Sequence, residues 1–286
     1  MEQIYKEIEE LSKLNINIIN QDKEYYQEKI VEYLKLIEKD GVNKWHFKLN
    51  LIALQISDKE DFDSHKAKCE EIAAALNNPE YEAELLLVLA NICRLNKDFE
   101  CAEKYYQKSL DLTKDLNNKL LYYRTELNYA TLLISLGNYL EAYKKLVMIE
   151  ENHIVKQDNV LLMTTYMWLA DIETKFKNYK KSIKYTDMMS QIALDMDNMP
   201  AYAIAQNTLG LNYYRSEKYE LAIIAFNNAI KACKDNVNHY LIAETIHSIG
   251  LVYSQLYDFT KAEEYLVKAL DYAEKHQCNR VISNAL

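Results

Sequence analysis

The chain has 286 residues, a hydrophobic content of 49% and a formal net charge of −9 at pH 7. It contains four Gly and two Pro, far below average usage, and because sandwiches, barrels and doubly wound sheets need these residues at turns, the composition favours nearly continuous helix. The negative charge argues against a protein that neutralises nucleic-acid phosphates. No apolar stretch is long enough to span a bilayer, and the first residues are charged, so we expect a cytoplasmic chain without a membrane partner.

The first residues predict a small helical cap. Two amphipathic segments near 2–15 and 23–40 form it, with Asp22 as a candidate N-cap of the second segment and Gly41 as its end. We therefore assign residues 1–41 to an N-terminal helical cap.

A repeat with a period of forty residues follows the cap. Residues 42–78 form its degenerate first copy, and residues 83–276 hold five clearer copies. All five carry a small residue at one position, which we call the anchor: Ala90, Ala130, Ala170, Gly210 and Gly250. Nine residues later all five carry an aromatic residue: Phe99, Tyr139, Tyr179, Tyr219 and Phe259. Twelve residues after the anchor the residue is small again: Ala102, Ala142, Ser182, Ala222 and Ala262.

This spacing has a simple packing explanation. Small residues at the two positions let two antiparallel helices cross closely, because a bulky side chain at either place would hold the backbones apart. The aromatic residue follows a polar pair, so we expect it to close the turn between the helices and to pack under it. One helix pair cannot bury its own apolar face, whereas stacked pairs can, as in a solenoid. The pattern predicts an all-α array of antiparallel helix pairs.

The repeat resembles the tetratricopeptide repeat (TPR) family. Its best copy carries the family signature at Leu209, Gly210, Tyr213, Ala222, Phe226 and Ala229. The third copy departs most, with other residues at the later positions: Glu173, Ser182, Thr186 and Met189. The period of forty, rather than thirty-four, is similar to that of bacterial signalling and peptide-sensing regulators. The resemblance covers roughly residues 42–286 and implies a right-handed α-solenoid.

The last residues predict a helix that is cut short. Residues 277–286 match the start of a sixth copy, and the chain ends four residues before its anchor. We therefore expect the sequence to be the front part of a longer natural protein. A tail that folds onto the last helix pair is the alternative.

The five cysteines are scattered without CxxC spacing, at Cys69, Cys93, Cys101, Cys233 and Cys278. An odd, scattered set favours a reducing compartment and small core residues over a disulfide framework or a zinc site. Cys93 and Cys101 fall within one predicted helix pair, so we expect both to pack in its core.

Motifs that would indicate an enzyme are missing from the sequence. It contains no Gly-rich phosphate loop, HExxH, GxSxG or CxxC, and its six histidines show no metal-ligand spacing. We therefore expect a protein that is not an enzyme, with no catalytic residue, no metal site and no cofactor.

The resemblance implies a concave groove lined by the first helix of each pair. Residues on one face of these helices, by the three-four rule, are the candidate peptide- or partner-binding residues: Asn91, Arg94, Arg124, Leu127, Thr131, Met167, Asp171, Lys175, Asn207, Leu211, Tyr214, Arg215 and His247. The face mixes amide, apolar and charged groups, and its basic residues outnumber its acidic ones. It therefore favours an extended, acidic peptide or a free C-terminus. Solvated side chains without a partner are the alternative.

One known TPR binding mode is disfavoured. Chaperone-binding TPR domains clamp a terminal carboxylate with lysines and asparagines. Asn91 and Asn128 match two of these positions, but Leu87 and Thr164 replace the lysines and Trp168 replaces a further basic residue.

Two functions remain after these exclusions. The first is a non-enzymatic scaffold that binds a protein or peptide in its concave groove. The alternative is the N-terminal sensory or regulatory part of a longer bacterial signalling protein, such as a peptide-sensing regulator or a TPR-headed diguanylate cyclase, whose output domain is absent from the sequence. The predicted partner is a protein or peptide rather than nucleic acid or membrane. A homodimer through the exposed terminal repeat stays open.

Overall fold

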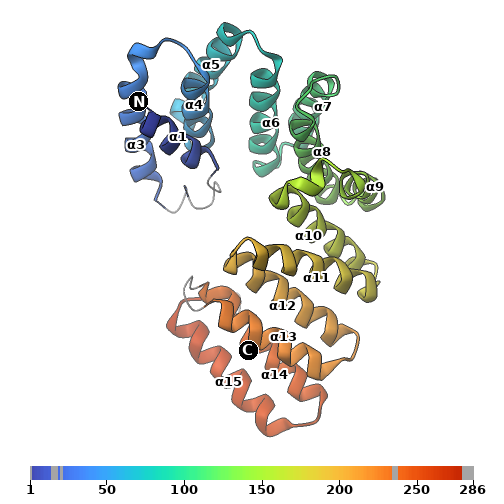
Figure 1. Cartoon of the computed structure of the whole chain (residues 1–286). Helices are drawn as coiled ribbons and strands as arrows, with labels where there is room; N and C mark the ends of the chain where they lie inside the picture. The colour runs from blue at the N-terminus through green and yellow to red at the C-terminus, as the bar shows by residue number, and fades with distance from the viewer. Residues whose placement is uncertain (1, 14–18, 20–21, 234–237, 279–286) are drawn as a thin grey trace. The chain divides into compact units, whose positions relative to one another are not determined.

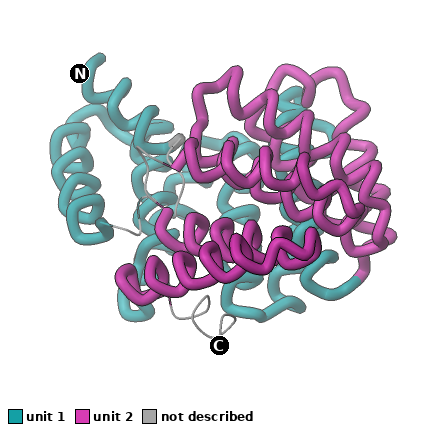
Figure 2. Tube along the Cα trace, turned by 90° about the horizontal axis from the view of Figure 1, so that it is seen from below, with its two compact units in different colours: residues 1–137 teal, residues 138–286 magenta. Residues whose placement is uncertain are grey.

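The computed structural model describes residues 2–13, 19, 22–233 and 238–278. Within these ranges every regular element is a helix (Figure 1), which confirms the all-α prediction. Among them, no helix has both the length and the apolar character needed to cross a membrane. The chain divides into two compact units, Met1–Gly137 and Asn138–Leu286 (Figure 2).

Unit 1 begins with the helices of the predicted cap and continues through α8. Its elements are α1 (Glu2–Lys13), α3 (Lys23–Ile37), the 3-10 helix η1 (Glu38–Asp40), α4 (Lys44–Ile56), α5 (Lys59–Leu76), α6 (Pro79–Leu95), α7 (Phe99–Thr113) and α8 (Lys119–Ser135). Helices α1, α3 and α4 share one apolar cluster that includes Ile8, Ile37 and Leu49. Helix α3 begins directly after Asp22, although the Asp22 side chain makes no capping hydrogen bond. Gly41, with a φ of 68°, ends η1.

Unit 2 holds the remaining described helices. They are α9 (Tyr139–Glu151), the 3-10 helix η2 (Val155–Gln157), α10 (Asn159–Lys175), α11 (Tyr179–Asp195), α12 (Met199–Arg215), α13 (Tyr219–Ala232), α14 (His239–Gln255) and α15 (Phe259–Lys275). The pairs α10–α11, α12–α13 and α14–α15 each pack side by side across a short turn (Figure 1). Of the further helix predicted at 277–286, residues 277 and 278 are not helical and residues 279–286 lie outside the described residues.

The small repeat positions are buried, as close helix crossing requires. At most 4% of the residue surface is exposed at Ala90, Ala130, Ala170, Ala102, Ala142, Ser182, Ala222 and Ala262. A Cβ added at Gly210 would collide with the ring of Phe226, and one added at Gly250 would lie 2.8 Å from Cγ of Leu266. The packing argument is therefore confirmed at Gly210 and Gly250.

The aromatic repeat positions lie at the starts of helices. Each is the first residue of the second helix in its pair, at Phe99, Tyr139, Tyr179, Tyr219 and Phe259. The prediction that the aromatic residue packs under the turn is wrong for Phe259, which is 64% exposed. The first helical residue lies at the rim of the pair rather than between its helices.

The turns within the pairs use the left-handed backbone region, mostly without glycine. Seven residues after each anchor φ is positive, at Lys97 (63°), Gly137 (79°), Lys177 (61°), Glu217 (60°) and Tyr257 (61°). In four of these turns, all but the one at Gly137, the next amide donates back to the first helix, as Asp98 N does to Cys93 O at 2.9 Å. This is the hydrogen-bond pattern of a helix C-cap. Low glycine content is thus compatible with a turn in every repeat.

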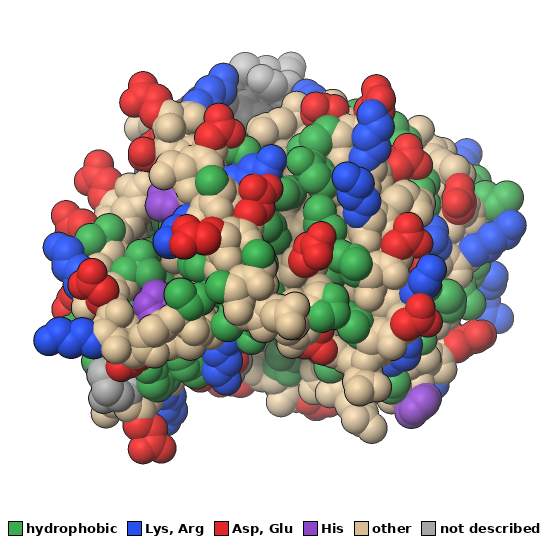
Figure 3. Space-filling model, turned by 90° about the horizontal axis from the view of Figure 1, so that it is seen from above, with side chains coloured by type: hydrophobic (Ala, Val, Ile, Leu, Met, Phe, Trp, Pro, Cys, Tyr) green, Lys and Arg blue, Asp and Glu red, His purple; other side chains and the backbone are tan. Residues whose placement is uncertain are grey.

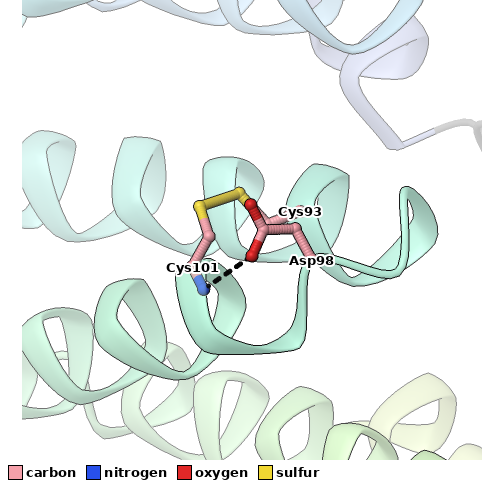
Figure 4. The surroundings of a disulfide bond; sticks show 3 residues. All are labelled: Cys93, Asp98 and Cys101. Atoms are coloured by element: carbon pink, nitrogen blue, oxygen red, sulfur yellow. Dashed lines mark hydrogen bonds between the residues drawn. A yellow bond between two sulfur atoms is a disulfide. The ribbon is translucent and has the colours of Figure 1, made fainter.

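The cysteines fall into two groups. Cys69, Cys233 and Cys278 are free and buried, as expected. Cys93 and Cys101 instead form a disulfide (Figure 4), so the prediction of simple core packing is wrong for this pair. The turn brings the last turn of α6 against the first turn of α7, and the two Cα atoms lie 5.9 Å apart, a separation that a disulfide spans.

Candidate partner-binding site

A cavity of about 370 Å³ opens on helices α10, α11 and α12 of unit 2. Its lining consists of Met167, Trp168, Ala170, Asp171, Thr174, Thr186, Met189, Thr208, Leu211 and Arg215. Four of these residues, Met167, Asp171, Leu211 and Arg215, belong to the predicted concave face. The forty-residue register therefore brings predicted residues of two first helices to one cavity.

The chemistry of this cavity is amphipathic. Met167, Trp168 and Leu211 supply a partly exposed apolar wall, whereas Asp171 and Arg215 are exposed charged residues. Apolar lining with a few polar groups is the usual composition of a ligand site, since burial supplies affinity and the polar groups fix orientation. The cavity can accept an apolar side chain next to a charged or amide group.

A hydrogen-bond network supports one wall of the cavity. Thr174 Oγ1 donates to Asn212 Oδ1 at 3.0 Å and lies 2.7 Å from Ser182 Oγ, and Asn212 Nδ2 donates to Ser182 Oγ at 2.9 Å. Ser182 and Asn212 are both fully buried. The three side chains satisfy one another, so Thr174 is held in place at the wall. Sequence reasoning missed this network, although Ser182 had stood out as a departure from the repeat signature.

The other predicted residues of unit 2 have partners of their own and do not line this cavity. Lys175 Nζ lies 5.1 Å from the centroid of the Tyr139 ring. Asn207 is 7% exposed and accepts a hydrogen bond from Thr245 Oγ1 at 3.0 Å.

Two further predicted residues of unit 2 are half-buried. The Tyr214 ring packs against that of Tyr219, with centroids 6.2 Å apart. Burial lowers the pKa of His247, and the nearby Glu244 acts in the opposite direction. Both side chains are partly accessible, and neither lines the cavity: Tyr214 packs on α13, and His247 belongs to α14.

In unit 1, the predicted residues on α6 contact α7. The Tyr106 hydroxyl donates to Asn91 Oδ1 at 2.7 Å. Burial raises the pKa of Tyr106 to about 12, although the positive charge of Arg94 opposes this shift. Arg94 Nε is itself buried without a hydrogen-bond partner among the described residues.

The predicted residues on α8 are two buried side chains and one exposed cation. Leu127 and Thr131 are 7% and 9% exposed, and the Thr131 hydroxyl donates to Leu127 O at 3.0 Å. Arg124 is exposed. Burial raises the pKa of Glu84, whereas the charges of Lys48 and Arg124 lower it.

The acidic and basic groups of this face in unit 1 offset one another. Lys48 Nζ lies 2.7 Å from Glu9 Oε2 and 5.3 Å from the centroid of the Trp45 ring. The sequence did not indicate the ion pair of Lys48 and Glu9. Lys48 belongs to the degenerate copy and Glu9 to the cap, and the repeat register is weakest in these two segments. Acidic and basic side chains are also interspersed over the face seen in Figure 3.

Comparison with known families gives an assignment for the repeats. Two family models described as tetratricopeptide repeat match the chain, one at residues 85–120 and the other at residues 201–275. The chain contains tetratricopeptide repeats. Both matched segments contain predicted anchors, Ala90 in the first and Gly210 and Gly250 in the second. No curated protein matches this TPR chain in sequence.

Solved structures share the fold of this TPR protein. The apo form of RapI superposes with a TM-score of 0.69 at 12% identity, covering 96% of this chain and 77% of RapI. A Rap protein complexed with competence and sporulation factor superposes with a TM-score of 0.64 at 14% identity, covering 99% of this chain and 80% of the Rap protein. A signal transduction ATPase with a tetratricopeptide repeat sensor, PH0952 from Pyrococcus horikoshii, superposes with a TM-score of 0.66 at 16% identity. The match covers 91% of this chain and 42% of PH0952. At these identities the likeness shows the fold alone.

Proposed function

We propose that this TPR protein is a non-enzymatic interaction protein, and that the cavity of unit 2 holds a side chain of an extended peptide or partner segment. The observation that carries the proposal is the convergence of Met167, Trp168 and Leu211 with the exposed Asp171 and Arg215 at one cavity. TPR proteins are interaction scaffolds, and a Rap protein of the same fold was solved in a complex with competence and sporulation factor.

The charges at the cavity select the peptide. Arg215 can form a charge-assisted hydrogen bond with a carboxylate of the ligand, and Asp171 can accept from a main-chain amide or a ligand cation. The preferred ligand therefore carries an apolar side chain with an acidic residue or a free C-terminus nearby. Leu127, Thr131 and Asn207 are buried and take no part in the proposed contact.

A charge reversal at the cavity tests this proposal. Random displayed peptides are selected on the wild-type protein, and the affinity of an enriched peptide is measured by isothermal titration calorimetry. We expect Arg215→Glu to weaken binding about tenfold or more, because an attractive charge becomes repulsive. Lys180→Glu makes the same charge change at an exposed position of α11 outside the cavity lining and serves as the matched control. Equal affinity of both variants would contradict the proposal, as would a selection that enriches no peptide.

A second proposal concerns the biological context. The likeness to PH0952, whose TPR part is described as a sensor, favours a sensory or regulatory module in a longer cytoplasmic bacterial signalling protein. A peptide-sensing regulator and a TPR-headed diguanylate cyclase both fit this description. The mass of the native protein in a cell extract tests the proposal. A mass well above the 33.6 kDa of this sequence supports it, and an equal mass contradicts it.

A further inference from the structure

Three helix pairs make a side-chain contact across their turn at the same two repeat positions. The first position lies three residues after the anchor, in the last turn of the first helix, and the second lies eleven residues after it, in the first turn of the second helix. We call this contact the cross-turn pair. It is the disulfide Cys93–Cys101, the ion pair Glu173–Lys181 with an N–O distance of 3.4 Å, and Tyr253–Lys261, with Nζ 5.1 Å from the ring centroid.

The backbone around the cross-turn pair is also the same in these repeats. The residue five positions after the first member donates its amide hydrogen to the carbonyl of that member. The bonds run from Asp98 N to Cys93 O at 2.9 Å, from Asn178 N to Glu173 O at 2.8 Å, and from Asp258 N to Tyr253 O at 3.0 Å. In these three pairs the repeat backbone thus brings together side chains of different chemistry. The two sulfur atoms of Cys93 and Cys101 meet for the same structural reason.

This pair is also more accessible than the other cysteines. Cys69, Cys233 and Cys278 are 0%, 3% and 8% exposed, and burial raises the pKa of Cys69 to about 12. Cys93 and Cys101 are half-buried, and Cys101 lines an open depression of about 430 Å³ on α7. A small thiol or disulfide can therefore reach this pair, whereas buried thiols are protected from exchange.

We propose that Cys93 and Cys101 form a reversible thiol–disulfide couple that fastens α6 to α7 when oxidised, with a low-molecular-weight disulfide such as oxidised glutathione as the oxidant. One protein thiolate attacks the small disulfide, forms a mixed disulfide and expels one small thiolate. The second protein thiolate then attacks the protein sulfur of the mixed disulfide and expels the other small thiolate. One protein disulfide and two small thiols are formed, and the two protons of the protein thiols pass to the departing thiolates. Excess small thiol reverses both steps.

The couple controls the order of the helix ends that it joins. Asn91 and Arg94 lie within one turn of Cys93, and both face Tyr106 of α7. In the oxidised form (Figure 4) the covalent link and the hydrogen bond from Cys101 N to Asp98 Oδ1, at 3.1 Å, hold the turn together. In the reduced form this turn relies on hydrogen bonds and packing alone, without the ion pair of α10–α11 or the cation–π contact of α14–α15. The couple does not depend on the proposed peptide site.

Thiol counting tests the chemistry directly. The full chain is reduced, desalted and equilibrated with a mixture of reduced and oxidised glutathione, and native protein is then alkylated and weighed by mass spectrometry. We expect two alkylated cysteines before oxidation and none after it, because the three free cysteines are buried. Unfolding the oxidised protein should expose three thiols, and added reductant should restore two more. Two stable mixed disulfides, or an unchanged pair of reactive thiols, would overturn the proposal.

Hydrogen exchange tests the structural consequence. We expect amides 96–98 to exchange at least about tenfold faster in the reduced protein, whereas the turns at 176–178 and 256–258 exchange equally in both forms and serve as internal controls. Cys93→Ser should show the fast rate under both conditions. As a control of geometry, Glu173→Cys combined with Lys181→Cys should form a second disulfide at the equivalent positions. Equal exchange rates at 96–98 in both forms would refute the fastening role, and failure of the engineered pair to oxidise would refute the shared geometry.

Discussion

The α10–α11 and α12–α13 pairs have the same backbone arrangement but different core chemistry. In α12–α13 the buried ring of Phe226, which lies sixteen residues after the anchor, packs against that anchor, Gly210. The equivalent residue of α11 is Thr186, whose hydroxyl donates to Ser182 O at 2.8 Å. The other repeats carry a large residue at this position: Tyr106, Leu146 and Leu266.

The difference explains where the cavity lies. Ala170, Thr186 and Met189 all line it, so it occupies the side of the pair where a large side chain has been replaced by threonine. The copy that departs most from the TPR signature is therefore a copy with space for a ligand beside its core. Departure from a repeat signature can indicate function when the lost side chain was a core residue.

The largest expected effect comes from a bulky residue at the anchor. Gly210→Leu should cost about 3 kcal/mol of unfolding free energy, since the new side chain would collide with Phe226. Ala170→Leu should cost about 1 kcal/mol or less, because the cavity can receive the added atoms. Urea unfolding of both variants measures the difference, and equal losses would contradict the explanation of the cavity.

A smaller effect is expected from the polar core of α10–α11. Ser182→Ala should cost about 2 kcal/mol, because Asn212 Nδ2 and Thr174 lose a buried partner. Ala222→Ser introduces a hydroxyl at the equivalent position of the apolar pair, where no comparable network exists among the described hydrogen bonds, and should cost about 1 kcal/mol. An unchanged Tm of Ser182→Ala in thermal unfolding would show that this network does not hold Thr174 in place.

A substitution in a turn can raise the unfolding free energy, whereas the substitutions above lower it. Glu217 occupies the left-handed region with a φ of 60°, so Glu217→Gly should stabilise the protein by about 1 kcal/mol. Gly137 has a φ of 79° at the equivalent position, and a Cβ there would meet nothing within 4 Å. Gly137→Ala should therefore lose about 1 kcal/mol through backbone strain alone. Chemical denaturation of the two variants should move the midpoint in opposite directions, and a shift of the same sign would be inconsistent with this account.

The smallest predicted effect depends on pH and involves the last pair, α14–α15. The His239 and His276 rings are stacked with centroids 3.7 Å apart. Burial lowers the pKa of His276, and the charges of His239 and Lys275 lower it further. The folded state therefore favours the neutral ring. This contribution to stability is fully present above pH 6.5, the ordinary pKa, and is lost as the pH falls below that value and through the lowered pKa of the folded state.

Thermal unfolding at pH 5 and at pH 7.5 measures this effect. We expect a lower Tm at the acidic pH, and a smaller decrease for His276→Gln than for the wild type. An identical decrease in both proteins would assign the pH dependence to other groups.

The helix pairs could be predicted from the sequence because each position of the repeat occurs in five copies, so that every residue can be compared with four equivalents. The small, buried anchors and the turn beside each aromatic position follow from that comparison. The width of the exposed stripe on each first helix does not, since it depends on how the next pair packs, and Leu127, Thr131 and Asn207 proved to be buried. The disulfide was missed because cysteines were judged by compartment rather than by their place at a cross-turn pair. Thr186 was visible as a departure from the signature, but its effect on volume required the packed structure.

The peptide affinity of Thr186→Leu tests most directly whether this cavity is the binding site. Leucine restores the large side chain that Leu146 and Leu266 supply at the equivalent positions, and it should fill the cavity while leaving the fold intact. We predict at least about a tenfold loss of affinity for a peptide selected on the wild-type protein, with little change in Tm. Unchanged affinity in a folded Thr186→Leu protein would contradict the claim that this cavity is the binding site.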